Sequence, residues 1–201
     1  MKKRGWMVGW WVAGLVLLGA GCASVAPGND PVVVRAEQTT AMAFETIDAF
    51  LDWEHSNRAM AGADVTAAAD KLRVEAPKWL RAARSATKAY KANRTDENKA
   101  TLVTAIAVLE SAMREAQQYL ATKPTAMLRA PAEPLRAGAD AALVMALIAA
   151  AMRLLELAQK ARDEAKRTKE WTPEEEADVD GKLSQAFNSD HWKPSGPMPG
   201  V

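Results

Sequence analysis

Residues 95–120 read TDENKATLVTAIAVLESAMREAQQYL, and this stretch decides the fold. Thr95 is suited to begin a helix, and Asp96 and Glu97 then lie in its first turn, where the helix dipole favours negative charge. Apolar residues follow at steps of 4, 3, 4, 3 and 4, a spacing that places them on one face of an α-helix. This apolar stripe consists of Leu102, Ile106, Leu109, Met113, Ala116 and Leu120.

The chain before residue 95 predicts two more helices. Apolar residues at 3/4 spacing predict a first helix over residues 35–57 and, after a loop at residues 57–62, a second helix that begins at Asp64. Pro77 is expected to kink or split the second helix, because proline lacks the N–H of a helix interior. Asn93 and Arg94 leave little room for a loop, so the second and third helices should form an antiparallel hairpin.

The chain after residue 120 predicts a crossing and then two helices. Prolines at positions 124, 131 and 134 indicate a non-helical crossing, and a fourth helix is predicted over residues 135–170. Its residues 141–152, AALVMALIAAAM, are too few to span a bilayer and indicate a central helix of a bundle. Residues 172–175, TPEE, form a capping box that opens a short acidic helix to Phe187.

Together these patterns predict an all-α protein, an antiparallel helical bundle of about four long helices plus a short C-terminal helix. Alanine is abundant and only 6% of the residues are aromatic, which favours helix over sheet. We predict a leader at residues 1–21, a flexible tether at 22–34, the bundle domain at 35–192 and a disordered tail at 193–201. Trp192 is predicted to clip the chain end onto the bundle.

The N-terminus has the anatomy of a secretory leader. Lys2, Lys3 and Arg4 form a basic start, and an uncharged apolar stretch of 13 residues, WMVGWWVAGLVLL, follows. Three small residues, GAG at positions 19–21, come directly before Cys22, which is the only cysteine. An uncut membrane anchor is the alternative, but 13 residues fall short of the ~20 that span a bilayer.

This leader resembles the signal peptide of bacterial lipoproteins, with residues 18–22, LGAGC, as the lipobox. The commonest lipobox has leucine three residues before the cysteine, whereas here Gly19 holds that place and Leu18 lies one earlier. The resemblance implies cleavage before Cys22, diacylglycerol on its sulfur and a membrane as partner. Because Ala23 is not aspartate, it also implies the outer membrane of a Gram-negative envelope. Two or three acyl chains hold a protein firmly on a bilayer.

Charge and cysteine content exclude several classes. Removing residues 1–21 takes away three cations and no acid, which leaves 23 basic and 25 acidic side chains. This balance gives no general reason to bind nucleic acid, so no nucleic-acid partner is expected. A single cysteine excludes an internal disulfide and a multi-cysteine metal site.

Candidate metal ligands are few. Asp48, Asp52 and His55 fall on one helical face, and carboxylates with an imidazole at that spacing suit a divalent metal. Di-iron bundles need a Glu-x-x-His motif on two helices, and this chain has one imperfect version, so a solvated helix end is the favoured interpretation. We find no motif for nucleophilic catalysis, and we predict no catalytic residue and no cofactor.

The most distinctive feature is a basic run. Between residues 76 and 95 there are six cations and no acid, and helical spacing gathers four of them, Arg81, Arg84, Lys88 and Lys91, on one side. Anionic lipid head groups, lipopolysaccharide phosphates or an acidic protein partner would suit such a surface. The alternatives are a solvated face or pairing with the acidic residues 170–180 of the same chain. Lys78 and, before Pro77, Arg73 widen this side, and we call the six residues the basic stripe: Arg73, Lys78, Arg81, Arg84, Lys88 and Lys91.

Two function classes follow. The first is a membrane-anchored envelope lipoprotein that acts as a non-enzymatic helical scaffold or interaction module. The second is a metal or small-ligand carrier, or an enzyme, with a site in the bundle near Asp48, Asp52 and His55. A filled interior favours the first class, and a polar pocket at those residues favours the second.

Overall fold

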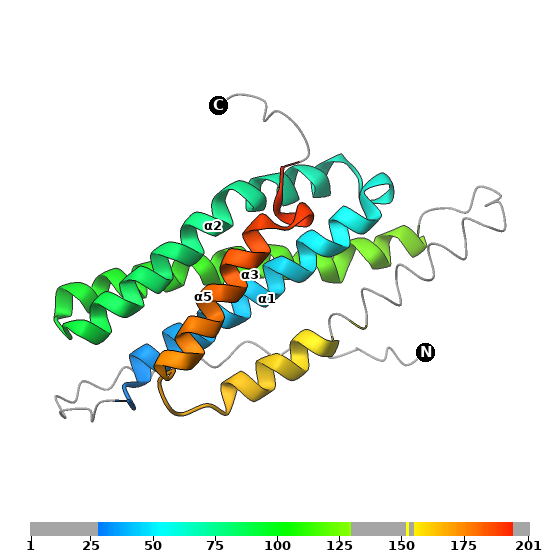
Figure 1. Ribbon diagram of the computed structural model, residues 1–201. Coiled ribbons are helices and arrows are strands. Elements are labelled where there is room, and N and C mark those ends of the chain that lie inside the picture. The colour runs from blue at the N-terminus through cyan, green and yellow to red at the C-terminus, as the bar shows by residue number, and fades with distance from the viewer. Residues whose placement is uncertain (1–27, 130–151, 153–154, 195–201) are drawn as a thin grey trace, which may run out of the picture.

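The computed structural model describes residues 28–129, 152 and 155–194, and every regular element in this part of the chain is a helix. Three long helices, α1 (Pro31–Ala61), α2 (Ala63–Ala92) and α3 (Asp96–Arg129), pack together, and Figure 1 shows their antiparallel order. Residues 155–165 form a further helical segment, and α5 (Pro173–Asn188) and the 3-10 turn η1 (Asp190–Trp192) follow. The predicted all-α bundle is confirmed. The leader, Cys22 and residues 195–201 lie outside the described residues.

Short connections hold the long helices side by side. Gly62 alone separates α1 from α2, and its φ of 84° is in the left-handed region that favours glycine. Residues 93–95 connect α2 to α3, which confirms the predicted hairpin. The N–H of Asn98 donates to the Thr95 hydroxyl at 3.2 Å, so Thr95 caps α3 as expected.

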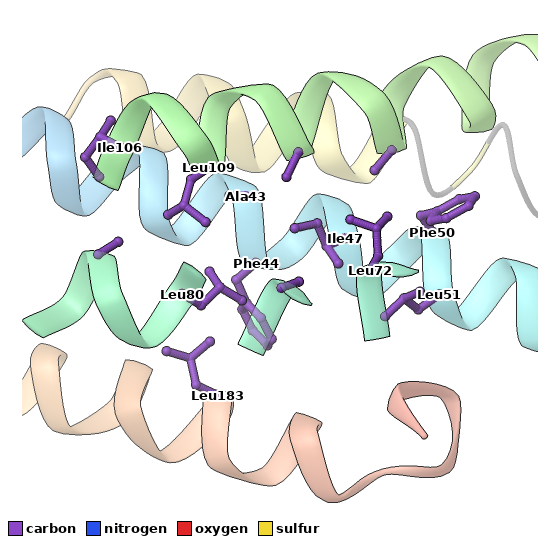
Figure 2. Close-up of a cluster of buried hydrophobic side chains, with 14 of the residues drawn as sticks. Ala43, Phe44, Ile47, Phe50, Leu51, Leu72, Leu80, Ile106, Leu109 and Leu183 are labelled. Atoms are coloured by element: carbon purple, nitrogen blue, oxygen red, sulfur yellow. The ribbon is translucent and has the colours of Figure 1, made fainter. Parts of the chain in front are cut away.

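The core lies where the three long helices meet (Figure 2). The stripe on α3 points into it as predicted, with Leu102 and Leu109 fully buried and Met113 partly buried. Phe50 and Leu72 come from α1 and α2, and Leu183 of α5 reaches the same cluster from outside. The described interior is therefore filled by side chains from all four helices.

Several predicted boundaries are wrong. The predicted tether extends too far, because α1 begins at Pro31, the side chain of Asp30 caps it, and Val33 and Val34 are buried. At its other end α1 continues past the predicted loop to Ala61, with a kink at Asn57, where φ is −121°. The second helix begins one residue before Asp64 and has no side-chain cap.

Two prolines are accommodated inside helices. Pro77 does not split α2, and Pro124 lies within the bounds of α3, so the predicted non-helical crossing does not begin there. Proline in a helix interior costs about 3 kcal/mol, and near Pro77 the fully buried Ala76 and Leu80 supply packing that offsets this cost. The other two prolines of the predicted crossing lie outside the described residues.

The predicted fourth helix is seen only in part. Residues 155–165 are helical, and the helix ends before the predicted residue 170. The described Met152 and Leu155 are each 65% exposed, whereas Leu157 packs against the core. The remaining residues of the apolar run at 141–152 lie outside the described part. Among the helices that the structure describes, none is both long enough and apolar enough to cross a membrane.

Candidate functional site

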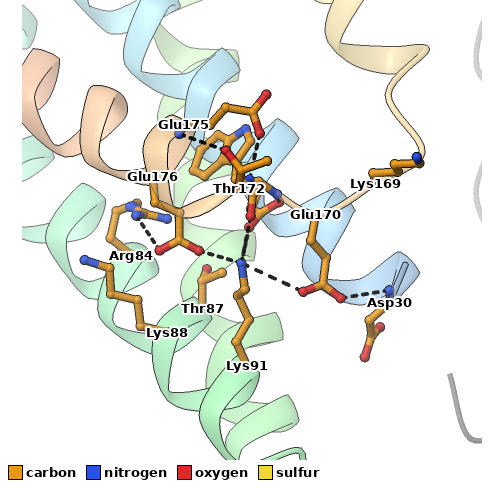
Figure 3. Close-up of polar contacts among 12 residues, drawn as sticks. Asp30, Arg84, Thr87, Lys88, Lys91, Lys169, Glu170, Thr172, Glu175 and Glu176 are labelled. Atoms are coloured by element: carbon orange, nitrogen blue, oxygen red, sulfur yellow. Dashed lines mark hydrogen bonds and ion pairs between the residues drawn. The ribbon is translucent and has the colours of Figure 1, made fainter. Parts of the chain in front are cut away.

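The basic stripe of α2 is covered by the C-terminal segment of the same chain. Figure 1 shows α5 lying across α1 and α2, and Figure 3 shows its acidic residues facing the cations of α2. The predicted capping box begins α5: the Thr172 hydroxyl accepts from the Glu175 N–H, and the Glu175 carboxylate accepts from the Thr172 N–H. This local structure fixes where the acidic face of α5 begins.

Arg84 is the central cation beneath α5. Its side chain is 5% exposed, its Nε donates to Oδ1 of Asp180 at 2.8 Å, and its Nη2 lies 3.4 Å from Glu176. Lys88 donates to the other oxygen of Asp180 at 2.7 Å. Burial alone would raise the pKa of Asp180, but the hydrogen bonds and charges of Arg84 and Lys88 hold it below its ordinary value. Asp180 therefore stays ionised and holds α5 on α2.

Lys91 joins three carboxylates from three parts of the chain. It donates to Glu176 of α5 and, at 3.2 Å, to Glu37 of α1, and Glu170 lies 3.8 Å away (Figure 3). Burial would lower the pKa of Lys91, but the hydrogen bonds and charges of Glu176 and Glu37 outweigh it and raise the pKa. Lys91 thus connects α1, α2 and the C-terminal segment.

Glu37 is the buried end of this network. Its side chain is fully buried, and its Oε2 accepts from the backbone N–H of Trp171 at 2.7 Å and from Arg167 at 3.3 Å. Removal from water raises the pKa of Glu37, although these partners and Lys91 oppose the shift. A buried carboxylate on α1 therefore fixes the backbone just before α5.

Two further contacts hold the same end of the segment. Two guanidinium groups lie over the indole ring of Trp171, that of Arg84 at 4.9 Å and that of Arg167 at 5.0 Å from the ring centre. Arg94 donates to Asp30 and to Glu170, both at 2.9 Å, so the first turn of α1 is tied to the residue before Trp171.

Arg73 does not belong to this surface. It is fully buried between α1 and α2, where it donates to Glu54, to Asp70 at 3.0 Å and to the carbonyl of His191 at 2.8 Å. Glu54 is also fully buried and accepts from Arg58 at 3.0 Å. Burial would raise the pKa of Glu54, but the guanidinium groups of Arg58 and Arg73 outweigh it and the pKa is lowered.

The interpretation of the basic stripe as a surface for lipid or another anion therefore does not hold for Arg73, Arg84 and Lys91. Arg84 is buried and Lys91 is enclosed by carboxylates because residues 170–180 pair with them, as the alternative interpretation had it. Arg73 is buried for a different reason, its pairing with Glu54 and Asp70 between α1 and α2. The outer members are accessible: Lys78 pairs with Glu75 at 2.9 Å, and Arg81 lies 4.8 Å from the centre of the Phe187 ring.

The candidate metal ligands do not converge. Asp48 accepts from the indole N–H of Trp192 at 2.7 Å and lies 2.8 Å from Nε2 of His191, whereas His55 is exposed. In the described part of the chain, no group of three or more His, Cys, Asp or Glu side chains is placed to hold a metal ion. A pocket of about 190 Å³ beside Asp48 is lined by Glu45, Asp48, Ala49, Asp52, Glu156, Leu157, Lys160 and His191.

The tryptophan clip is confirmed. Trp192 is buried and packs against Phe44 of α1 and Phe187 of α5, with ring centres 6.3 and 5.0 Å away. Asp48 accepts the only N–H of the indole ring, so this end of the chain is held by apolar packing and one directed hydrogen bond.

Asp48→Ala is expected to lower the free energy of unfolding by about 1–2 kcal/mol, because the buried indole N–H of Trp192 loses its acceptor. Urea unfolding measures the change, and hydrogen exchange should show faster exchange at residues 189–192. Asp163→Ala is the matched control, since that side chain is 75% exposed and should change stability by less than about 0.5 kcal/mol. Equal effects of the two variants would contradict the assignment.

Comparison with protein-family models, with curated proteins and with solved structures finds no match for this chain.

Proposed function

We propose that the protein is a lipid-anchored helical module of the bacterial cell envelope that works by binding another protein and not by catalysis. The observation that carries this proposal is the leader, in which a basic start and an apolar stretch end in small residues directly before Cys22. In this proposal, acyl chains on Cys22 attach the module to the outer membrane, on its periplasmic side.

The start of the helical domain suits a protein held close to a membrane. Only five residues lie between Cys22 and Gly28, where the described structure begins, and they span at most about 20 Å. Asp30 then joins the charge network through Arg94. A lipid on Cys22 would therefore keep α1 and the C-terminal segment near the bilayer surface.

The ion pairs between α2 and α5 support the proposal that the protein acts by binding another protein. Cations of α2 hold the acidic helix α5, whose residues lie 85 to 96 positions further along the chain than the cations they pair with. Complementary charge of this kind gives an association specificity and speed. A module that already binds one acidic helix has the chemistry to bind another.

Cys22→Ser is expected to abolish lipid attachment when the chain is expressed in a Gram-negative host. Labelled palmitate should enter the parent chain and not the variant, which should keep its leader and gain the corresponding mass. Ala23→Ser is the matched control and should label normally, whereas Ala23→Asp should move the protein to the inner membrane. A Cys22→Ser chain that is cleaved and still fractionates with membranes would sink the proposal.

A small-ligand carrier is the second candidate, favoured by the pocket beside Asp48. Four carboxylates and Lys160 line that pocket, so a small cationic ligand is the chemistry that it suits. Equilibrium dialysis against a divalent metal ion and against a linear polyamine tests this role. Stoichiometric binding that Asp48→Ala abolishes would support this role. Binding of neither probe would exclude divalent metal ions and linear polyamines as ligands of the pocket.

A further inference from the structure

Ion pairs and a partly buried apolar face together hold α5 on the bundle. The helix carries five carboxylates and one lysine. Leu183 is its one buried residue, and Val179, Ala186 and Phe187 pack against the core while partly exposed. Its partners on α2 are three cations, which make four ion pairs with Glu176 and Asp180. Because ion pairs are screened by salt and most of the apolar face of α5 is only partly buried, α5 detaches more easily than a fully buried helix of the bundle.

The contact is made by one face of α5. Glu176, Asp180, Leu183 and Phe187 follow one another at steps of 4, 3 and 4 residues, so they lie on one side of the helix. The two acids bind Lys91, Arg84 and Lys88, the leucine is buried, and the phenylalanine lies under Arg81. The part of the basic stripe from Arg81 to Lys91 therefore contacts a definite pattern: two carboxylates one turn apart, followed by two apolar residues.

The sequence of α5 weakens the helix that carries this pattern. Gly181 lies in the middle of α5, and a Cβ built there meets no atom within 4 Å. No packing contact therefore requires glycine at this position. Glycine in a helix interior is markedly less favourable than alanine, so Gly181 makes the helix α5 less stable than alanine at the same position would, although the contacts of α5 would permit alanine.

The fit between α5 and α2 is also incomplete. A groove of about 430 Å³ remains between the two helices. Arg81, which is exposed, and Lys88, which is 52% exposed, line this groove together with Ser85 of α2 and Ser184 of α5. The basic stripe thus stays accessible at one edge while α5 is in place, and an incoming helix has charged side chains to contact first.

We propose that four members of the basic stripe, Arg81, Arg84, Lys88 and Lys91, form a docking surface for an acidic amphipathic helix of a partner protein, and that α5 is an internal competitor that occupies it. The partner helix carries the pattern of α5, with acids at i and i+4 and apolar residues at i+7 and i+11. The inference rests on the proposed binding function and names the chemistry of its partner. Because α5 is part of the same chain, it covers the docking surface in most molecules, a state that we call closed. The apparent affinity for the partner is the affinity of the uncovered surface multiplied by the fraction of chains in which α5 is detached.

The experiment uses a fluorescent peptide that copies residues 170–192 and the full chain purified in detergent. Charge reversal in the Glu176→Lys, Asp180→Lys chain should release α5, and the peptide should bind this chain at least tenfold more tightly than the parent. Gly181→Ala on the parent background should close α5 more firmly and weaken peptide binding about fivefold. We call the Glu176→Lys, Asp180→Lys chain the opened chain, and the affinity of the peptide for it should fall as the salt concentration rises.

Controls separate specific docking from general attraction. A peptide of the same composition in scrambled order should bind the opened chain at least tenfold more weakly than the copy of residues 170–192. Hydrogen exchange should show that α1, α2 and α3 keep their protection in the opened chain. If charge reversal unfolds the bundle, the neutral Glu176→Gln, Asp180→Asn chain takes its place, with a smaller gain in affinity.

Three results would overturn the inference. Equal binding of the peptide to the parent and opened chains would show that α5 does not compete, and equal binding of the scrambled peptide would show that only net charge matters. A parent chain that dimerises by exchanging α5 would assign the surface to a second copy of this chain. Each of these leaves palmitate labelling at Cys22 unchanged, so it is distinguishable from failure of the anchored-module proposal.

Discussion

Arg73→Ala is expected to lower the free energy of unfolding by about 3–5 kcal/mol. Arg73 and Glu54 are both fully buried, and removal of the guanidinium leaves the carboxylate of Glu54 with Arg58 alone. The variant also removes the donor to the carbonyl of His191, which holds the turn that carries Trp192. Urea unfolding measures the loss, and hydrogen exchange at residues 189–192 should report the freed turn.

The joint replacement Arg73→Met, Glu54→Leu should be far less damaging than Arg73→Ala. Two apolar side chains of similar volume need no desolvation of charge, and such replacements of buried ion pairs are often neutral or stabilising. We expect a stability within about 1–2 kcal/mol of the parent chain. A joint variant as unstable as Arg73→Ala would show that the ion pair contributes net stability that apolar packing does not replace.

The parts of the fold that the sequence predicts are those that local chemistry determines. The apolar stripe at residues 102–120 needs only helical periodicity, and it points into the core as expected. The capping box at Thr172 and Glu175 needs only residues three apart, and both of its hydrogen bonds form. The hairpin of α2 and α3 follows from a connection of three residues, which leaves the chain no other path.

The helix boundaries are harder to predict from sequence, because packing overrides local helix propensity. Pro77 and Pro124 carry strong signals against a helix interior, yet both lie within helices of the bundle. Asp30-Pro31 carries the opposite signal, an N-cap followed by proline at the first helical position, and it marks the true start of α1. That signal was hidden by the turn-rich residues around it, which suggested a tether.

The orientation of the basic stripe is not encoded in α2 alone. A helical wheel shows which cations share a side, but the segment that covers them lies about 90 residues away. Whether the cations of α2 contact water, lipid or the acids of α5 depends on the tertiary structure, which the sequence of α2 does not specify. Glu37 did leave a local signal, since it lies on the same helical face as the buried Val33, Thr40 and Phe44. An acid on an apolar face indicates a buried charge with a partner elsewhere.

These observations separate two kinds of buried charge in one bundle. Glu54 lies against two guanidinium groups, which lower its pKa, whereas burial raises the pKa of Glu37 despite its three donors. The first carboxylate joins α1 to α2 and the second joins α1 to the segment before α5. The contact that holds the C-terminal segment is therefore the one in which ionisation is less favourable.

Glu37→Ala is expected to destabilise the chain by about 3 kcal/mol and to release the segment that leads into α5. The buried N–H of Trp171 loses its acceptor, and Lys91 and Arg167 lose a buried counter-charge. Urea unfolding measures the stability, and hydrogen exchange should rise at residues 167–180 more than in α3. Glu110→Ala is the control, because Glu110 pairs with Arg35, which is 67% exposed, and its loss should cost less than about 1 kcal/mol.

Glu37→Gln tests the sign of the pKa shift. A carboxyl group whose pKa is raised on folding contributes stability below its unfolded pKa of about 4.5, and this contribution is lost as pH rises through the higher folded pKa. The stability of the parent minus that of Glu37→Gln should therefore decrease as pH increases above about 4.5. A difference that grows with pH over this range would mean that Lys91, Arg167 and the Trp171 N–H outweigh burial, and the free energy of holding the C-terminal segment would then come from the ion pair itself.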